Sequence, residues 1–319
     1  MTVRNRLAKI SVVVPSYNKP EYLPECLRSV QAQTFTDWEC IVVNDGSPRG
    51  DEIRAAVTAM NDPRFRLVEH EINRGLAAAR NTGVREARAE LVICVDEDDW
   101  IREDCLEKLL FHFEHGSPDI VCPQGWMVGA RPRVRGCRLA SIEEILVHQT
   151  FLPAGFLLRK SAWQEVGGWD EHPILARGRE DTEWWIRMVR HGFRIRVIDE
   201  PLYLYREAQT ADDAARSLDM NARRDEVELR KYIIKKHGDL YAKYPSQRRR
   251  LLAMACQAEA RFHQSSGNHW RSIFRMWQAA MYSPQKRTVI KAMKTTLAGL
   301  LGERKLESIL RWKRRMAGA

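Results

Sequence analysis

The stretch from Leu91 to Trp100, LVICVDEDDW, constrains the fold of this chain more than any other. Five apolar residues, three of them β-branched (Val92, Ile93 and Val95), run directly into four consecutive acids. A short apolar run that ends at polar residues is typical of a strand buried on both faces of a sheet. Ligands of open α/β sheets bind beyond the carboxyl ends of the strands, where these acids stand.

The four acids, Asp96, Glu97, Asp98 and Asp99, repel one another unless a cation neutralises them. Their hard oxygens suit Mg²⁺ or Mn²⁺, and Mg²⁺ is commonly shared between one or two carboxylates and substrate phosphates. The alternative is an acidic cap on a following helix, because Asp is favoured at helix starts. An EF-hand loop fits poorly, because no Gly and no Glu follow at the required spacing.

Further strands and helices alternate through the first half of the chain. Asn18 is predicted to cap a helix that has Pro20 in its first turn. The pattern predicts strands at 10–15, 39–43 and 65–69, and helices at 51–60 and 76–89. Such alternation predicts a mostly parallel sheet with helices on both faces. Tyr17, Asp45 and the acids of residues 96–99 then come after neighbouring strands along one edge.

The second half of the chain is less regular. Ser141 and Glu144 are predicted to form a capping box for a short helix that reaches His148. Glu180 and Asp181 stand immediately before a helix that Gly192 ends. The remaining predictions are strands at 119–121, 153–159 and 194–198, a basic loop at 131–138, a helical turn at 161–166 and a helix at 182–191.

The charge is concentrated in the last third of the chain. Residues 219–319 contain 23 Lys and Arg against 8 Asp and Glu, a net charge of +15, whereas the whole chain carries +10. Residues 1–218 therefore have a net charge of −5. This asymmetry predicts a basic helical region, 218–319, appended to a catalytic domain, 1–217, and it favours contact with an anionic surface.

The seven cysteines are scattered, and no CxxC pair occurs. Neither a zinc site nor a disulfide framework is predicted, which favours a reducing, cytoplasmic compartment. No apolar run approaches the roughly 18–20 residues of a membrane span, and the N-terminus does not match a signal peptide.

Six motifs in order carry a family resemblance. They are VVVPSYNKPEYLPECLRSVQAQTF, VVNDGS, NRGLAAARNTG, VDEDDW, GGWDE and GREDTEWWIRM. Across about residues 9–206 the chain resembles family 2 glycosyltransferases with the GT-A fold. The resemblance implies an inverting transfer of a hexosyl or N-acetylhexosaminyl group from a nucleotide-diphosphate donor, typically a UDP-sugar. The acceptor is a hydroxyl in glycan or cell-surface polysaccharide biosynthesis.

The resemblance also implies roles on the donor side. Tyr17 and Asp45 would hold the base, and Asp96 would reach the ribose or a metal-bound water. Asp98 would ligate Mn²⁺ or Mg²⁺, with Asp96 as its partner in the DxD pair. The other donor-side residues are Pro15, Arg80, Asn73 and Arg74. The plainer alternatives are a packed surface tyrosine at 17 and a turn aspartate at 45. Asp99 is expected to cap the element after it, with a share in the site as the alternative.

On the acceptor side, an inverting transfer needs a general base to take the proton of the attacking hydroxyl. The family's ED pair assigns that role to Asp181, with Glu180 orienting it or holding the acceptor. The alternative is that both acids only stabilise a helix start. Trp169 and Asp170 would contact the acceptor. Trp184 and Trp185 are adjacent, so at least one is expected in the core.

One departure concerns the metal. Many relatives have a histidine two positions after the late Tyr-Arg pair, whereas Ala208 stands there in this chain. A third protein ligand is therefore not expected, and the carboxylates, phosphates and water would hold the ion. This departure leaves open a different class, a catalytically silent protein that binds nucleotide sugar or scaffolds an assembly.

The basic tail has helical periodicity. Val289, Met293, Leu297 and Leu301 repeat every four residues, and basic side chains stand beside them. Residues 286–315 are predicted either to lie on an anionic membrane, which would suit a lipid-linked glycan acceptor, or to pack as a helical bundle. Nucleic acid is not an expected partner, because no recognised binding module accompanies the charge.

Overall fold

The computed structural model describes residues 8–129, 131–147, 155–207 and 225–301. It divides into two compact units: one contains the sheet, and the other contains the C-terminal helices together with Arg177–Arg179. The predicted domain boundary, between residues 217 and 218, lies outside the described residues. The first unit is the α/β domain that the sequence predicts.

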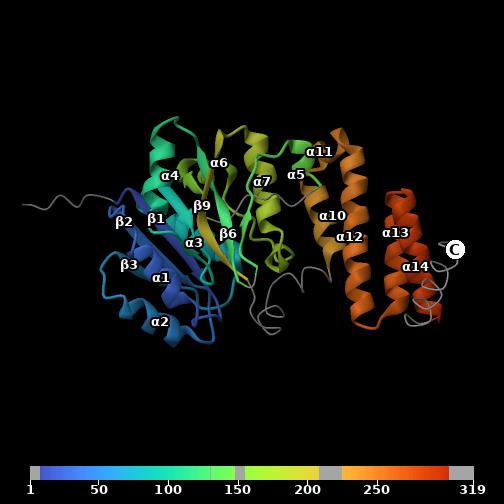
Figure 1. Cartoon of the computed structure of the whole chain (residues 1–319), viewed down its shortest axis with the longest axis horizontal. Helices are drawn as coiled ribbons and strands as arrows, with labels where there is room; N and C mark the ends of the chain where they lie inside the picture. Colours follow the sequence, from blue (N-terminus) through green and yellow to red (C-terminus); the bar gives the residue numbers. More distant parts are fainter. Residues whose placement is uncertain (1–7, 130, 148–154, 208–224, 302–319) are drawn as a thin grey trace, which may run out of the picture. The chain divides into compact units, whose positions relative to one another are not determined.

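The first unit is built on one nine-stranded mixed sheet (Figure 1). The strands are β1 (Ile10–Ser16), β2 (Trp38–Asn44), β3 (Phe65–Glu69), β4 (Leu91–Cys94), β5 (Trp100–Ile101), β6 (Ile120–Val128), β7 (Arg133–Arg135), β8 (Leu157–Arg159) and β9 (Ile195–Arg206). Their order is β3-β2-β1-β4-β8-β6-β9-β5, with β7 paired to β6. The first four strands are mutually parallel, and β8 is antiparallel to β4 and β6.

Helices cover both faces of this sheet, as predicted. They are α1 (Leu23–Gln31), α2 (Gly50–Ala59), α3 (Leu76–Glu86), α4 (Cys105–Glu114), α5 (Ile142–Ile145), α6 (Lys160–Val166) and α7 (Glu180–His191), with a 3₁₀ turn η1 (Leu175–Arg177). Alternate residues of one strand point into different cores. Val12 and Val14 pack with α1, α2 and α4, whereas Val13 packs with α3, α6 and α7.

The sheet register brings the polar strand ends together. Ser16 at the end of β1 is opposite Asn44 at the end of β2, and Val13 is opposite Cys94 at the end of β4. Parallel strands in register end at the same edge, so residues 16–19, 45–47 and 96–99 share that edge. This confirms that three segments distant in sequence meet.

Several predicted boundaries are wrong. Helix α1 begins at Leu23 rather than directly after Asn18, which has a left-handed backbone conformation with a φ of +61°. The proline in the first turn of α1 is therefore Pro24 and not Pro20. The predicted basic loop at 131–138 contains β7, which lengthens the sheet by pairing with β6. Helix α4 has no counterpart in the sequence prediction. Glu180 and Asp181 lie in the first turn of α7 rather than before it.

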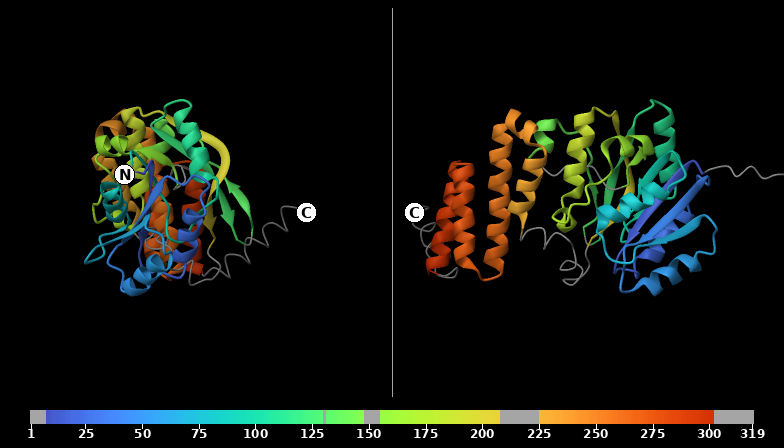
Figure 2. Two further views of the ribbon diagram at one scale, coloured as in Figure 1. Left: turned by 90° about the vertical axis from the view of Figure 1, so that its left-hand side faces the viewer. Right: turned by 180° about the vertical axis from the view of Figure 1, so that it is seen from behind.

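The second unit is helical. Its elements are α10 (Glu226–Lys236), α11 (Gly238–Lys243), α12 (Pro245–Ser265), α13 (His269–Tyr282) and α14 (Lys286–Leu301). Its buried residues include large side chains, such as Leu229 and Ile233, and small ones, such as Ala255 and Ala279. Helices α12, α13 and α14 run side by side in the right-hand view of Figure 2. Residues 302–319 lie outside the described part of the chain.

Candidate active site

The four consecutive acids at the end of β4 have four different environments. Asp96 Oδ1 accepts from Arg80 Nη2 at 2.8 Å. Glu97 is buried against β1, where it accepts from the backbone N–H of Tyr17 at 2.9 Å and from the hydroxyl of Ser16. Burial raises the pKa of Glu97 to about 7.

The last two acids, Asp98 and Asp99, also have different partners. Asp98 Oδ2 pairs with Lys19 Nζ at 2.6 Å. Asp99 is buried and accepts from the hydroxyl of Tyr203 and the backbone N–H of Arg206, both at 2.9 Å. Asp99 therefore fastens the acidic loop to β9, and the prediction that it caps a following element is wrong. Protein cations and N–H donors offset much of the repulsion that the sequence suggests.

Arg80 is the centre of the site. Its Nη1 lies 3.0 Å from Asp181 Oδ1 and 3.4 Å from Glu180 Oε1, while Nη2 holds Asp96. Arg80 is buried in α3, whose small neighbours Ala77 and Ala79 pack against the sheet. A buried guanidinium requires such pairing. Three carboxylates from two distant segments, predicted for donor and catalytic roles, are thus brought to one side chain.

The two acids of the ED pair, Glu180 and Asp181, differ in their exposure to solvent. Glu180 is buried, and burial followed by the charge of Asp181 raises the pKa of Glu180 to about 7. The side chain of Asp181 is 48% exposed, so it can reach a molecule in solution. Of the two acids, Asp181 has the access that a general base needs, and Glu180 has the position of a supporting group.

Asp45 has a structural environment of its own. Its carboxylate is buried and accepts from His70 Nδ1 at 2.7 Å and from the backbone N–H groups of Arg74 and Gly75 at 2.9 and 2.8 Å. His70 Nε2 lies 2.9 Å from the hydroxyl of Thr82. These bonds fix the loop that begins at Asn73. The sequence prediction did not include His70, although a histidine directly after β3 is a polar strand end of the kind used to find Asp45.

Other donor-side residues are distributed along the same edge. Tyr17 is exposed, as a residue that stacks on a base must be, whereas Pro15 is buried within β1. Asn73 is exposed, and Arg74 Nη2 pairs with Glu171 at 3.0 Å.

Of the two predicted acceptor residues, Trp169 has an environment different from the one expected. Trp169 is only 3% exposed and stacks on Trp184, with ring centroids 5.0 Å apart. The Arg80 guanidinium lies 5.8 Å from the Trp169 ring centroid. An open aromatic face for a sugar is therefore absent at Trp169 in this conformation, and the ring instead supports Arg80.

Asp170 accepts from the backbone N–H of His172 at 2.9 Å. Trp184 and Trp185 are both buried, so the expectation for this pair is confirmed.

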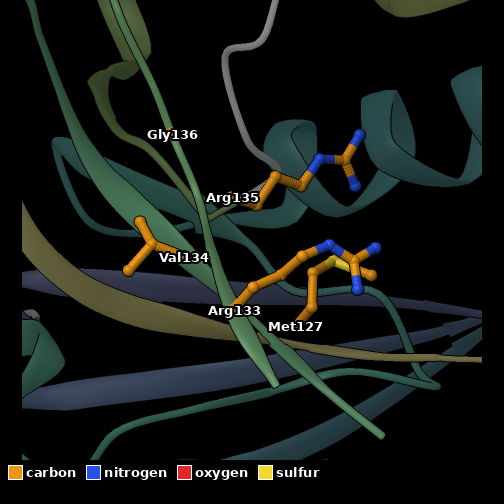
Figure 3. Close-up of a pocket in the computed structure, with 5 residues that line it drawn as sticks. All are labelled: Met127, Arg133, Val134, Arg135 and Gly136. Carbon is orange, nitrogen blue, oxygen red and sulfur yellow. The ribbon is translucent and has the colours of Figure 1, made fainter. Parts of the chain in front are cut away.

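A pocket lies beside strands β6 and β7 (Figure 3). It has a volume of about 480 Å³ and is lined by Met127, Arg133, Val134, Arg135 and Gly136. Arg133 and Arg135 extend to the same side of β7 in Figure 3. The Arg135 guanidinium lies 4.5 Å from the Tyr205 ring centroid. These arginines were predicted to lie in a loop. The reason is that β7 pairs with β6, and the sequence prediction covered only the first residues of β6.

The residues fit a divalent cation in their chemistry. Asp96, Glu180 and Asp181 face one guanidinium, which leaves a surplus of negative charge, and Asp96 and Asp98 supply hard oxygens. Within the described residues, no three His, Cys, Asp or Glu side chains are grouped to hold a metal ion. An ion here would need ligands from phosphate and water. Ala208, where relatives have a histidine, is outside the described residues.

The seven cysteines are all buried and free. Burial raises the pKa of the Cys94 thiol to about 12. These thiols pack as small apolar groups, and none is poised as a nucleophile.

A mixed sheet with helices on both faces and acids at its carboxyl edge defines the GT-A class of α/β proteins. Solved structures with this architecture resemble the chain. Staphylococcus aureus TarS 1–349 in complex with UDP-GlcNAc has a TM-score of 0.59 at 18% identity, covering 96% of this chain and 92% of TarS 1–349. A mannosyltransferase, PcManGT from Pyrobaculum calidifontis, in complex with GDP-Man and Mn²⁺, has a TM-score of 0.53 at 18% identity, covering 92% of this chain and 81% of that one.

Sequence comparisons identify the family. The sequence model of glycosyl transferase family 2 matches residues 11–154, and that of glycosyl transferase family group 2 matches residues 91–300. The chain therefore belongs to the family 2 glycosyltransferases.

Curated relatives agree with that assignment. The uncharacterized glycosyltransferase EpsJ of Bacillus subtilis is 32% identical over 213 residues, which is 62% of this chain and 61% of EpsJ. Glycosyltransferase GlyG of Streptococcus pneumoniae is 29% identical over 239 residues, covering 69% of this chain and 77% of GlyG. The chain thus spans less than two thirds of the length of EpsJ.

Proposed function

We propose that this chain is an inverting glycosyltransferase that moves a sugar from a nucleotide-diphosphate donor to an acceptor hydroxyl. The observation that carries the proposal is the convergence on Arg80 of Asp96, from the donor motif, and Asp181, from the acceptor motif. A transferase needs donor and acceptor groups at one place, because holding two reactants together removes much of the entropic cost of reaction.

A nucleotide-sugar donor is supported by the strand-edge residues and by the structural neighbours. TarS is known in complex with UDP-GlcNAc and PcManGT with GDP-Man. In this chain, exposed Tyr17 is suited to cover a base, and Asp45 lies in the adjacent turn. A UDP-sugar is the proposed donor, with a hexosyl or N-acetylhexosaminyl group to transfer.

The proposed reaction is a single displacement. The acceptor oxygen forms a bond to the anomeric carbon as the bond from that carbon to the diphosphate oxygen breaks, so the configuration inverts and the nucleoside diphosphate leaves. The Asp181 carboxylate takes the hydroxyl proton. Arg80 keeps Asp181 and Asp96 in place, and Glu180 is held behind them by burial.

We further propose that Asp98 and Asp96 hold Mn²⁺ or Mg²⁺ together with the diphosphate. Such an ion, when bound, supplies charge neutralisation for the leaving group. The half-buried Asp98 carboxylate, whose present partner is Lys19, is a suitable ligand. The Mn²⁺ complex of PcManGT supports a divalent ion in this fold.

The proposed setting is glycan or cell-surface polysaccharide synthesis, with a free or lipid-linked glycan as acceptor, at the inner face of the cell membrane. Among the described helices, none is long and apolar enough to cross a bilayer. Contact with the membrane would then be peripheral, through the basic C-terminal region.

A panel of nucleotide sugars, tested by thermal shift with and without Mn²⁺, is the experiment for donor binding. A ligand that binds only the folded state raises the melting temperature. We expect at least one UDP-sugar to raise it, more so with Mn²⁺, and Asp98→Asn to remove the Mn²⁺-dependent part. Exposed Asp51→Asn, on α2, is the matched control. No shift with any nucleotide sugar would contradict the proposal, and tight binding without turnover would favour the silent alternative.

A further inference from the structure

Helix α13 carries a stripe of large apolar side chains that face solvent. Trp270, Phe274, Trp277 and Met281 are between 41% and 74% exposed. Their spacing of four, three and four residues places them on one face of the helix. The buried residues of α13, which include Met276 and Ala280, face another direction, because they pack with Ala260 of α12.

Helix α14 carries a second stripe. Ile290, Met293, Leu297 and Leu300 are between 40% and 62% exposed, at spacings of three, four and three residues. The buried Ala292 of the same helix packs into the cluster shared with α12 and α13. Met293 and Leu297, two residues of the apolar periodicity predicted for the tail, therefore lie on the surface rather than in a core.

The two stripes belong to one surface, because α13 and α14 are closely paired. Trp277 Nε1 donates to the hydroxyl of Thr296 at 3.1 Å. A Cβ on Gly299 would come within 2.7 Å of the terminal Cδ1 of Ile273, so the two helices are in contact at this position. From these contacts and the 100° turn per residue, both stripes point to the side of the pair away from α12. We call the eight exposed apolar residues of α13 and α14 the hairpin face.

The hairpin face is bordered by positive charge. Arg271 is exposed on the outer flank of α13, and Arg287, Lys291 and Lys294 are exposed on the outer flank of α14. The sequence contains no Asp or Glu between Glu259 and Glu303. Contiguous apolar patches of this kind mark interaction sites, and an acid-free basic border selects an anionic partner.

We propose that the hairpin face docks on an anionic lipid surface. Aromatic and long aliphatic side chains suit the boundary between head groups and acyl chains, while flanking Lys and Arg attract the anionic head groups. The location differs from that predicted from sequence, residues 286–315, because α13 contributes half of the face, including both exposed tryptophans. The proposal does not depend on catalysis and can fail or hold separately from the transferase activity.

Flotation of the full chain with vesicles tests the proposal. Vesicles of phosphatidylcholine alone are compared with vesicles that also contain phosphatidylglycerol. One variant carries Trp270→Ser, Phe274→Ser and Met281→Ser; another carries Lys291→Glu and Lys294→Glu. The matched charge control is Arg249→Glu with Arg250→Glu, since both arginines are exposed on α12 of the same unit. Circular dichroism and melting temperature verify that each variant folds.

We expect the wild type and the control to float with anionic vesicles only. Each Lys near an anionic surface contributes about 1 kcal/mol and the two substitutions also add negative charge, so the lysine variant should bind at least about thirtyfold more weakly. The apolar variant should lose at least about tenfold. If the Arg249 and Arg250 control lost as much vesicle affinity as the lysine variant, net charge alone would explain the loss. That result would overturn the proposal.

Two further outcomes would also overturn it. In the first, the wild type does not bind vesicles but self-associates, and the apolar variant does not self-associate. That result would show that the hairpin face binds a second copy of the chain. The other is vesicle binding that appears only when residues 303–319 are deleted, which would assign that segment as the occupant in the full chain.

Discussion

The Nη2 atom of Arg80 donates to Oδ1 of Asp96 across 2.8 Å, which ties the middle of α3 to the end of β4. The other terminal nitrogen of the same guanidinium holds Asp181, at the start of α7, at 3.0 Å. Arg80 is therefore the physical link between the residues proposed for the donor and those proposed for the acceptor. We therefore expect the site to depend on this arginine.

Substitution of Arg80 should affect both stability and activity. Arg80→Ala removes the partner of buried Glu180 and of the partly exposed Asp96 and Asp181, which costs at most about 3–5 kcal/mol of unfolding free energy because solvent screens the exposed carboxylates. Arg80→Lys keeps the charge but cannot bond both acids with a planar fork, so we expect a smaller loss of stability with a large loss of turnover. Urea unfolding and rate measurements verify this. Arg85→Lys, exposed on the same helix, is the control, and equal effects of the two lysine variants would refute the assigned role.

Stability should respond to pH through Glu180. Burial raises the pKa of this group to about 7 in the folded state, above its ordinary value of 4.5. The unfolded chain therefore loses the proton first, and the folded state is progressively destabilised as pH rises from about 4.5 to about 7, by roughly 1–3 kcal/mol. In Glu180→Gln this decline should disappear.

Unfolding free energies of Glu180→Gln and wild type at several pH values provide the measurement. The advantage of the variant should grow as pH rises through that range. Glu90→Gln, at an exposed position, serves as control. A difference between Glu180→Gln and wild type that does not change with pH would show that Glu180 is ionised in both states.

The contact of His70 with Asp45 predicts an effect on nucleotide binding. His70→Ala removes one of the donors that fix the Asp45 carboxylate, so UDP affinity should fall by about tenfold, the value of one hydrogen bond to a charged group. Pyrophosphate affinity should change little, because that ligand lacks the base. Calorimetric titration with both ligands distinguishes the two. Equal losses of UDP and pyrophosphate affinity would indicate a general disruption of this edge of the sheet. Unchanged UDP affinity would show that the contact of His70 with Asp45 does not contribute to recognition of the base.

Close packing of α3 on β1 is a test of the fold. A Cβ on Gly83 would lie 2.2 Å from a methyl carbon of Val13, so Gly83→Ala should destabilise by about 1–3 kcal/mol through overpacking. At Gly238, the first residue of α11, nothing lies within 4 Å of the added Cβ. Gly238→Ala should be neutral or mildly stabilising by a few tenths of a kcal/mol. Denaturant melts compare the two, and similar values would contradict the described packing.

Local sequence was sufficient for the parallel half of the sheet. Buried strands such as β1 and β4 appear as continuous apolar runs because both faces are covered, and their polar ends marked the functional edge. The capping box of Ser141 and Glu144 is also confirmed, with each backbone N–H bonded to the other side chain at 3.1 and 3.3 Å. These features depend on residues close in sequence or on one strong pattern.

The features that the sequence did not predict depend on distant pairing. Asp99 looked like a local cap, but its partners Tyr203 and Arg206 are on β9, more than 100 positions away. Trp169 looked like a sugar platform, but its stacking partner Trp184 is in α7. Arg80 was a predicted donor residue, yet its connection to Asp181 could not be inferred, because no periodicity encodes which loop faces a helix.

Release of nucleoside diphosphate from a nucleotide sugar, measured in the presence of an acceptor, tests the central claim most directly. Asp181→Asn should lower turnover by about 10²–10⁴-fold, the contribution of a general base, while donor affinity is retained. Asp199→Asn, at an exposed position on β9, should leave turnover unchanged. Full turnover in Asp181→Asn, with the donor and acceptor that wild type uses, would contradict the account.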